Sequence, residues 1–295
     1  MKNRIKPASA PPPLHAHIDQ AWVIAYKEQT DRLEQALTQE GFSCNVLRQV
    51  HREEFRTYSP SYLTLLNHRS AWEQAVRSNL PTLVVEADFV PVVGMGGLQL
   101  PFPPDEKQVG IAWLYTCAPQ MYSVSRDGYA QGYSSSMVAY IVTPNGAESL
   151  ISLADEIRQT IGPTTYSSWD SSIDPFLRKR GFKNFIPFRN YGEHGGRPNL
   201  EHQQHGLSRV HRADVLYGRL AFIPPYALRT SSSGSEGPVR LDEYLRFFKA
   251  RSHARLKGLA RLASGKYLRL KILRNSSVPA WLIGFAIRRH LSPRL

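Results

Sequence analysis

The pattern of apolar and polar positions predicts an α/β chain over residues 22–180. Short apolar runs rich in β-branched residues are typical of buried strands, whereas apolar residues at every third or fourth position are typical of helices that face a core. The strand–helix–strand order at the start is a β-α-β opening, and such openings often begin nucleotide-binding folds. The predicted strands are 22–26, 44–50, 82–85, 110–115 and 137–142, and the predicted helices are 31–40, 61–78, 145–158 and 175–180.

The strand at 82–85 ends at two acidic residues, Glu86 and Asp88, with one residue between them. In open α/β sheets the ligand crevice lies outside the carboxyl ends of the strands. Two carboxylates at that position can share a divalent cation, which in turn takes oxygens from a diphosphate. Such pairs are also common in solvated turns, so the spacing alone leaves a metal site and a polar turn as alternatives.

Phosphate-binding and zinc-binding motifs are absent from the sequence, and this limits the kinds of ligand site it can form. The chain has neither a GxGxxG fingerprint nor a GxxxxGK[ST] P-loop, which excludes both of those phosphate-binding loops. Residues 191–213 are rich in histidine, but the spacing is not that of a zinc finger and no cysteine is nearby. We predict that most of these histidines are surface residues and that His211 completes the metal site, because Arg212 and Asp214 beside it form a charged cluster. The histidines of this stretch are His194, His202, His205 and His211.

The positive charge is concentrated at one end of the chain. The net charge of the 295 residues is +13, but residues 240–295 contain 14 Lys and Arg against two acids, and the rest is nearly neutral. A basic segment of this kind favours an anionic partner, either lipid head groups or nucleic acid. The two cysteines suit a reducing compartment, and the chain shows no secretory signal and no apolar run of about 20 residues.

The basic segment itself has two parts. Residues 241–263 are predicted to form a basic helix, and the apolar run at 278–287 is too short to span a bilayer. The segment can lie in a membrane interface with Trp281 at head-group level, or it can pack on the main domain with its basic face in solvent. We therefore divide the chain into a flexible arm at 1–21, a globular domain at 22–229, a serine- and glycine-rich linker at 230–240 and a basic amphipathic segment at 241–295.

Several blocks, in the same order, resemble glycosyltransferase family 25, the lipooligosaccharide and lipopolysaccharide biosynthesis transferases. Two departures are visible, because Ala87 replaces the middle acid of the family's Glu-Asp-Asp motif and Asn67 stands where serine is usual. The segments at 198–202 and 211–214 are similar to those of a bacterial, cyanobacterial subgroup. The matching blocks are Val23–Tyr26 with Asp31-Arg32, His68–Trp72, Leu83–Asp88, Gly132 with Ala139–Thr143 and Gly146-Ala147, and Ile173–Leu177.

The resemblance implies a GT-A fold, with a single mixed Rossmann-like sheet flanked by helices. It also implies a nucleotide-sugar donor, typically UDP-linked, a divalent cation such as Mn²⁺, and inversion at the anomeric carbon. Inversion needs a base near the acceptor hydroxyl; Asp174 is the first candidate and Asp170 the second, with helix capping as the alternative role for both. The resemblance carries Arg32 and His68 over to the donor site. The expected donor-binding residues are Arg32, His68, Glu86 and Tyr140, and the expected metal ligands are Glu86 and Asp88 with His211.

The expected function is transfer of a sugar to a lipid-linked or lipopolysaccharide-core acceptor. The protein is expected in the cytoplasm, peripherally bound to the inner face of the membrane through residues 241–295, so that removing residues 240–295 would release it from anionic vesicles and leave transfer to a soluble acceptor intact. One alternative is a catalytically silent nucleotide-sugar-binding protein on the same scaffold. A nucleic-acid-binding role for the basic segment is the other alternative, but no recognised motif supports it and no nucleic acid partner is expected.

Overall fold

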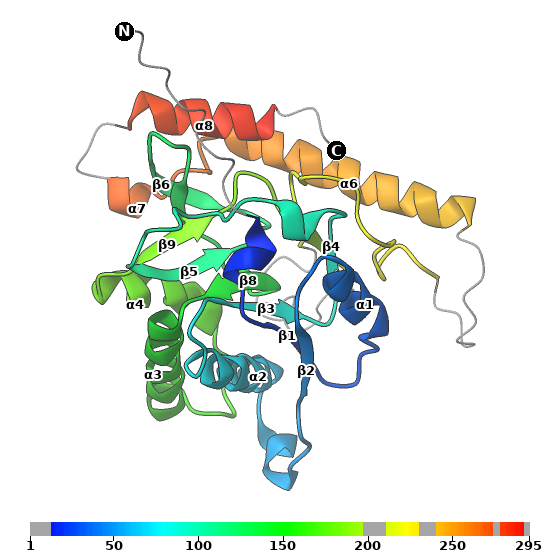
Figure 1. The fold of residues 1–295 in the computed structure, drawn as a ribbon, viewed down its shortest axis with the longest axis vertical. Coiled ribbons are helices and arrows are strands. Elements are labelled where there is room, and N and C mark those ends of the chain that lie inside the picture. The colour runs from blue at the N-terminus through cyan, green and yellow to red at the C-terminus, as the bar shows by residue number, and fades with distance from the viewer. Residues whose placement is uncertain (1–12, 197–210, 230–239, 274–277, 292–295) are drawn as a thin grey trace, which may run out of the picture.

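The computed structural model describes residues 13–196, 211–229, 240–273 and 278–291. An eight-stranded mixed sheet forms its centre, in the strand order β2-β1-β3-β8-β5-β9-β7-β6 (Figure 1). A second sheet pairs β4 (Phe89–Pro91) with β10 (Gly192–His194). The strands of the large sheet are β1 Ala21–Ala25, β2 Cys44–Arg48, β3 Thr82–Glu86, β5 Val109–Trp113, β6 Gln120–Val124, β7 Ala130–Tyr133, β8 Ala139–Val142 and β9 Lys183–Ile186.

Helices cover the sheet and one end of the molecule. The predicted α/β architecture, a single large mixed sheet flanked by helices, is confirmed, and each predicted strand and helix forms within a few residues of its expected bounds. The helices are α1 Asp31–Gln39, α2 Pro60–Ala75, α3 Pro144–Thr160, α4 Ile173–Lys179, α6 Leu241–Ala263, α7 Leu270–Leu273 and α8 Ala280–His290, with short 3-10 turns η1 Leu14–His17, η2 Glu53–Thr57, η3 Met95–Gly97 and η4 Trp169–Ser172.

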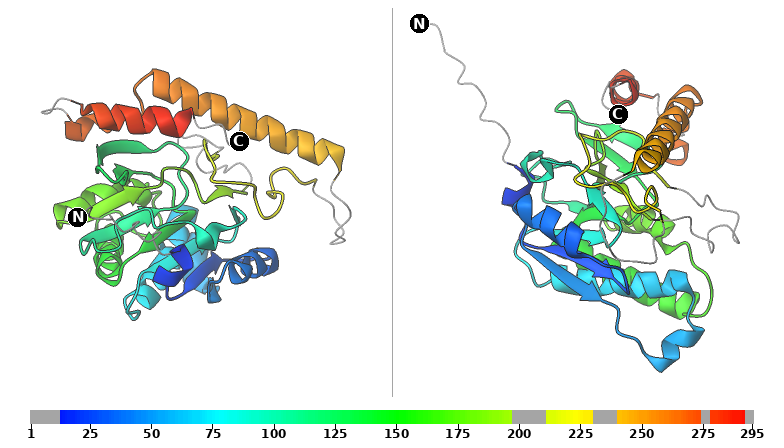
Figure 2. Two further views of the ribbon diagram at one scale, coloured as in Figure 1. Left: turned by 45° about the horizontal axis from the view of Figure 1, so that its top comes forward. Right: turned by 90° about the vertical axis from the view of Figure 1, so that its right-hand side faces the viewer.

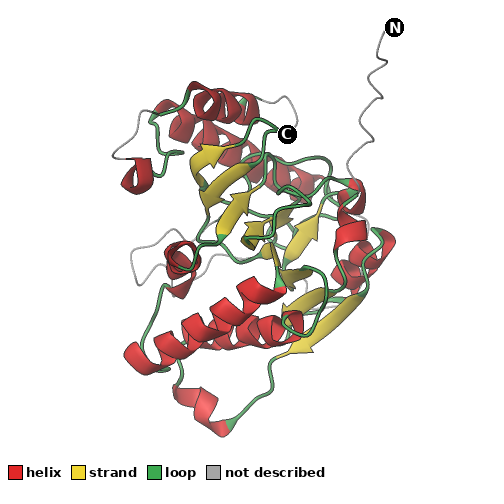
Figure 3. Cartoon of the chain, turned by 60° about the vertical axis from the view of Figure 1, so that its left-hand side comes forward, coloured by secondary structure: helices red, strands yellow, loops and turns green. Residues whose placement is uncertain are grey.

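Alternate side chains of the central strands build two cores, one on each face of the sheet. On one face Val84 of β3 packs in the same cluster as Trp72 of α2 and Leu150 of α3. On the other face Leu83 packs with Leu33 of α1. Helices α2 and α3 lie side by side beneath the strands (Figure 3). Strand β3 is parallel to β1 and antiparallel to β8, so the sheet is mixed at its centre.

The predicted flexible arm is wrong for residues 13–21. Leu14 is fully buried, and its backbone N–H donates to the carbonyl of Leu98 at 2.6 Å. Burial of this apolar side chain and the backbone bond together hold η1 against the body. Residues 1–12 lie outside the described residues.

The C-terminal helices are packed on the main body (Figures 1 and 2). Phe285 of α8 meets Phe188 with ring centroids 5.2 Å apart, in a T-shaped contact. Arg289 of α8 forms a buried ion pair with Asp214, and Arg251 of α6 forms one with Glu193. The described part of 241–295 therefore takes the packed alternative, and the predicted linker lies, except for Arg240, outside the described residues. Among the described helices, none is long and apolar enough to cross a bilayer.

Candidate functional site

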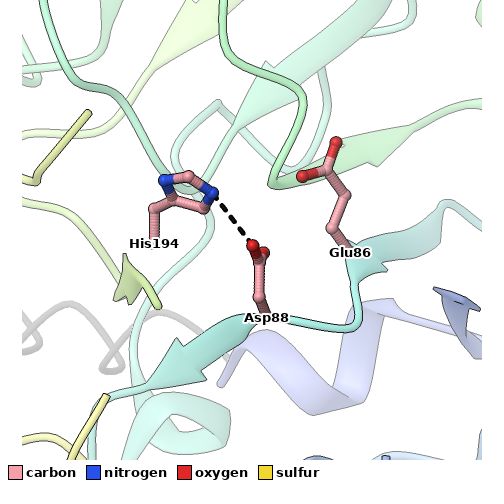
Figure 4. Close-up of side chains that lie close together, drawn as sticks. All are labelled: Glu86, Asp88 and His194. Atoms are coloured by element: carbon pink, nitrogen blue, oxygen red, sulfur yellow. Dashed lines mark ion pairs between the residues drawn. The ribbon is translucent and has the colours of Figure 1, made fainter. Parts of the chain in front are cut away.

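Strand pairing places a histidine beside the acid pair. Strand β3 ends at Glu86, and a tight turn through Asp88 leads into β4. Because β4 pairs antiparallel with β10, His194 lies opposite Phe89, the neighbour of Asp88. The Nε2 atom of His194 lies 3.0 Å from Oδ2 of Asp88 (Figure 4). Each of Glu86, Asp88 and His194 offers a ligand atom within 4.8 Å of the other two.

Asp88 and His194 form a charged pair, and His194 must release its proton before its ring nitrogen can bind a metal. Burial opposes ionisation of Asp88, but the positive charges of His194 and Arg212 lower the pKa of Asp88 below its usual value. Burial also disfavours charge on His194, yet the Asp88 carboxylate raises the pKa of His194 to about 9. Asp88 Oδ1 is buried and has no hydrogen-bond partner among the described residues. An orphaned carboxylate oxygen beside a second carboxylate and an imidazole is a donor set that suits Mn²⁺.

Two glycines allow the chain to pass close to this ion pair. The backbone N–H of Gly195 donates to the carbonyl of Asp88 at 2.7 Å. A Cβ on Gly196 would lie 2.3 Å from Asp88 Oδ2 and 2.4 Å from His194 Nε2. Because real Cβ atoms do not approach other atoms so closely, only glycine fits at position 196 without moving the pair.

A chain of buried hydrogen bonds, which begins in the core at Trp72, orients Glu86. Trp72 Nε1 donates to the Tyr140 hydroxyl at 2.8 Å, and that hydroxyl lies 2.9 Å from His68 Nδ1. His68 Nε2 lies 3.2 Å from Glu86 Oε1. Since the tryptophan can only donate, we assign the Tyr140 proton to His68 Nδ1 and a proton on His68 Nε2 to Glu86. Both His68 and Tyr140 are fully buried, so they position Glu86 rather than line the cavity.

The acid pair and His194 form part of the wall of a cavity of about 1130 Å³. Asp170 of η4 lines the same cavity. Burial, with a smaller effect from the negative charge of Glu86, raises the pKa of Asp170 to about 6. Helix α6 adds His253 and Lys257 to the wall. The cavity thus combines carboxylates, a carboxyl that titrates near neutrality and cationic side chains, which together suit an anionic ligand and proton transfer.

Three predicted site residues lie in other positions. Asp174 is buried in the core, where its Oδ1 accepts from Asn184 Nδ2 at 2.9 Å and from the Tyr122 hydroxyl at 3.2 Å, and it does not line the cavity. Arg32 lies by a separate pocket at α1. His211 lines the large cavity, but its Nδ1 faces Cys117 Sγ at 3.3 Å, and His194 rather than His211 joins the two acids.

Sequence reasoning gave no role to several of these residues. His194 was one of a group of four histidines, and only the glycines after it signal a close approach of the backbone. His253 and Lys257 lie on a helix whose basic residues looked equivalent, and no local signal separates them. His202 and His205 lie outside the described residues.

No protein-family model matches the chain, and a search of curated proteins finds no match. Among solved structures, the chain is similar to a glycosyltransferase involved in glycosylation of the major capsid of PBCV-1, with a TM-score of 0.36 and 9% identity over 57% of this chain and 81% of that one. It is also similar to a mutant Drosophila β-1,4-galactosyltransferase 7 in complex with manganese, UDP-Gal and xylobiose, with a TM-score of 0.32 and 14% identity. That match covers 58% of this chain and just under two thirds, 65%, of the other. Likeness at this level does not assign the chain to a family.

Proposed function

We propose that this protein is a GT-A glycosyltransferase that transfers a sugar from a nucleotide diphosphate donor, UDP-linked in the simplest case, to a glycan acceptor with inversion. The observation that supports it most is the cluster of Glu86, Asp88 and His194 at the end of a central strand, in the wall of a cavity large enough for a nucleotide sugar. A bound divalent cation, Mn²⁺ for this donor set, would neutralise charge on the departing diphosphate. Glu86, Asp88 and His194 would hold it.

Asp170 is the proposed base. It lines the cavity, and a pKa of about 6 makes it an anionic proton acceptor at neutral pH whose basicity is greater than that of an ordinary aspartate. In this role its carboxylate takes the proton of the acceptor hydroxyl as that oxygen bonds to the anomeric carbon. Asp174, whose Oδ1 accepts bonds from Asn184 and Tyr122, would keep a structural role in the neighbouring core.

The cationic wall supports an anionic donor. The cations Lys257 of α6 and Arg212 line the same cavity as the acid cluster, and His253 of α6 lines it too. Cations in this wall can pair with the phosphates of a nucleotide and restrict its orientation. The proposal also places the chain in family 25. Its acceptor would be lipid-linked or part of a lipopolysaccharide core at the inner face of the membrane.

The proposal is tested by titrating the full chain with a panel of nucleotide sugars, with and without Mn²⁺, beside Asp88→Ala. The control is Asp105→Ala, because Asp105 is an exposed carboxylate that does not line the cavity. We expect metal-dependent binding of one UDP-sugar, lost in Asp88→Ala and retained in Asp105→Ala. Binding that is equal in all three proteins would contradict a metal site at Asp88.

Turnover is measured separately with the sugar identified by this titration. Metal-dependent binding with release of UDP and transfer to an acceptor supports the enzyme. Tight binding without release of UDP would instead support the catalytically silent binding protein. If no nucleotide sugar binds, the proposed function is wrong.

A further inference from the structure

Helix α6 presents several large apolar side chains to solvent. The face toward the body carries Glu243 and Arg251, both buried, together with the small residues Ala254 and Gly258. The opposite face carries large apolar residues at spacings of four, three and eight, which place them on one side of a helix. We call this set the outer stripe, and its members and exposed fractions are Leu241 76%, Leu245 60%, Phe248 56% and Leu256 65%.

Helix α8 repeats this arrangement. Leu282, Phe285 and Ala286 are buried against the body. The outward side chains, which we call the α8 outer face, are Trp281, Ile283, Ile287 and Leu291, with Trp281 62% and Leu291 63% exposed. The two helices lie side by side on the outside of the molecule (Figures 1 and 2). Apolar surface of this extent, placed on adjacent helices, marks an interaction site.

The charges beside the apolar residues indicate the partner. Arg246, Lys249 and Arg288 are exposed on the same two helices, and Asp242 is the only exposed acid in the described part of 241–291. Asp242 is itself paired with Arg246 at 2.6 Å. A second copy of the chain would bring like charges together, whereas an anionic bilayer attracts the cations and accepts the apolar side chains. We propose that the outer stripe and the α8 outer face bind the surface of an anionic lipid bilayer.

The same helix links this surface to the cavity. His253 and Lys257, which line the cavity, belong to the same helix as the outer stripe, three residues before and one residue after Leu256. A protein bound through α6 therefore holds one wall of its cavity next to the bilayer. The identity of the acceptor rests on the proposed transferase function. With that function, the acceptor is a glycan carried on a lipid and presented from the head-group region.

The experiment measures cosedimentation of the full chain with vesicles of phosphatidylcholine and phosphatidylglycerol, and with vesicles of phosphatidylcholine alone. The variant Leu245→Glu/Leu256→Glu places two carboxylates in the outer stripe. The matched control is Leu80→Glu/Ile161→Glu, which makes the same chemical change at two exposed apolar residues, 46% and 42% accessible, in other parts of the molecule. We expect the wild type and the control to bind anionic vesicles, more weakly as salt increases, and the stripe variant to bind at least about tenfold more weakly.

Two results would overturn the proposed bilayer surface. Absence of vesicle binding by the wild type, or equal binding by the stripe variant, rules out this surface. A concentration-dependent dimer in lipid-free solution that the stripe variant abolishes, without vesicle binding, assigns the stripe to a second copy. Nucleotide-sugar binding is measured on the same samples; vesicle binding without it would leave the surface standing while the transferase function fails.

Discussion

Arg251 of α6 donates to Glu193 at 2.5 Å, and Glu193 is the residue before His194 of the candidate metal site. Glu193 Oε1 also accepts from the backbone N–H groups of His194 at 3.0 Å and Ala213 at 2.9 Å. Helix α6 thus holds strand β10, which brings His194 to Asp88. The expectation that the body keeps its activity without residues 240–295 does not suit this arrangement, since their removal takes away Arg251 and Arg289, the cationic partners of Glu193 and Asp214.

Arg251→Leu is expected to lower the free energy of unfolding by about 3 kcal/mol or more, because Glu193 remains as an unpaired buried charge. The control is Arg246→Leu on the same helix; its ion pair with Asp242 is exposed to solvent and is expected to contribute little to stability. Denaturant unfolding of both variants measures the difference. Equal stability of the two would show that the Glu193 pair does not hold α6 to the body.

Asp170→Asn is expected to raise stability and abolish most of the transfer. The folded-state pKa of about 6 lies above the ordinary 3.8, so the carboxyl costs stability as the pH rises from 4 to 6, and the full cost is present above 6. Asparagine removes the charge and can still accept the bond from the Ser171 N–H, for a gain of roughly 2 kcal/mol at pH 8 that disappears below pH 4.

The pH profile of transfer gives the second readout for Asp170. A base must be deprotonated, so the rate of the wild type is expected to rise through pH about 6 and then level off. The Asn variant should lose about 100-fold or more and show no such rise. A profile that stays flat from pH 5 to 8, in a wild type that remains folded, would assign the base to another group.

Gly196→Ala is expected to weaken Mn²⁺ binding by about tenfold or more, because the new methyl group would displace the Asp88–His194 pair. Gly97→Ala is the matched control, since a Cβ there meets no atom within 4 Å and the backbone is not left-handed. Calorimetric titration of Mn²⁺ into each protein measures the effect. Unchanged affinity in Gly196→Ala would place the cation away from Asp88 and His194.

The local pattern of the sequence was enough to locate the longer helices, five of the ten strands, and the acid pair at the end of β3. A buried strand needs consecutive apolar side chains and a helix needs a repeat near 3.6, and both periods are visible in short windows. The short strands β4, β6, β7, β9 and β10 were missed. Most of the strands that were found are continuous apolar runs, whereas β6, β7, β9 and β10 carry polar residues and β4 has only three residues, so none of them stands out from a loop.

Only the tertiary structure decided which histidine joins the acids. The sequence determined that Glu86 and Asp88 lie at the end of a strand. His194 reaches them through the antiparallel pairing of β4 with β10, which lie about a hundred residues apart. Local periodicity does not predict which distant strands pair. The tertiary structure also decided which face of α6 packs on the body. Its leucines would by themselves predict a face turned toward the core, yet the buried ion pair between Arg251 and Glu193 fixes the opposite face against the body and leaves the outer stripe in solvent.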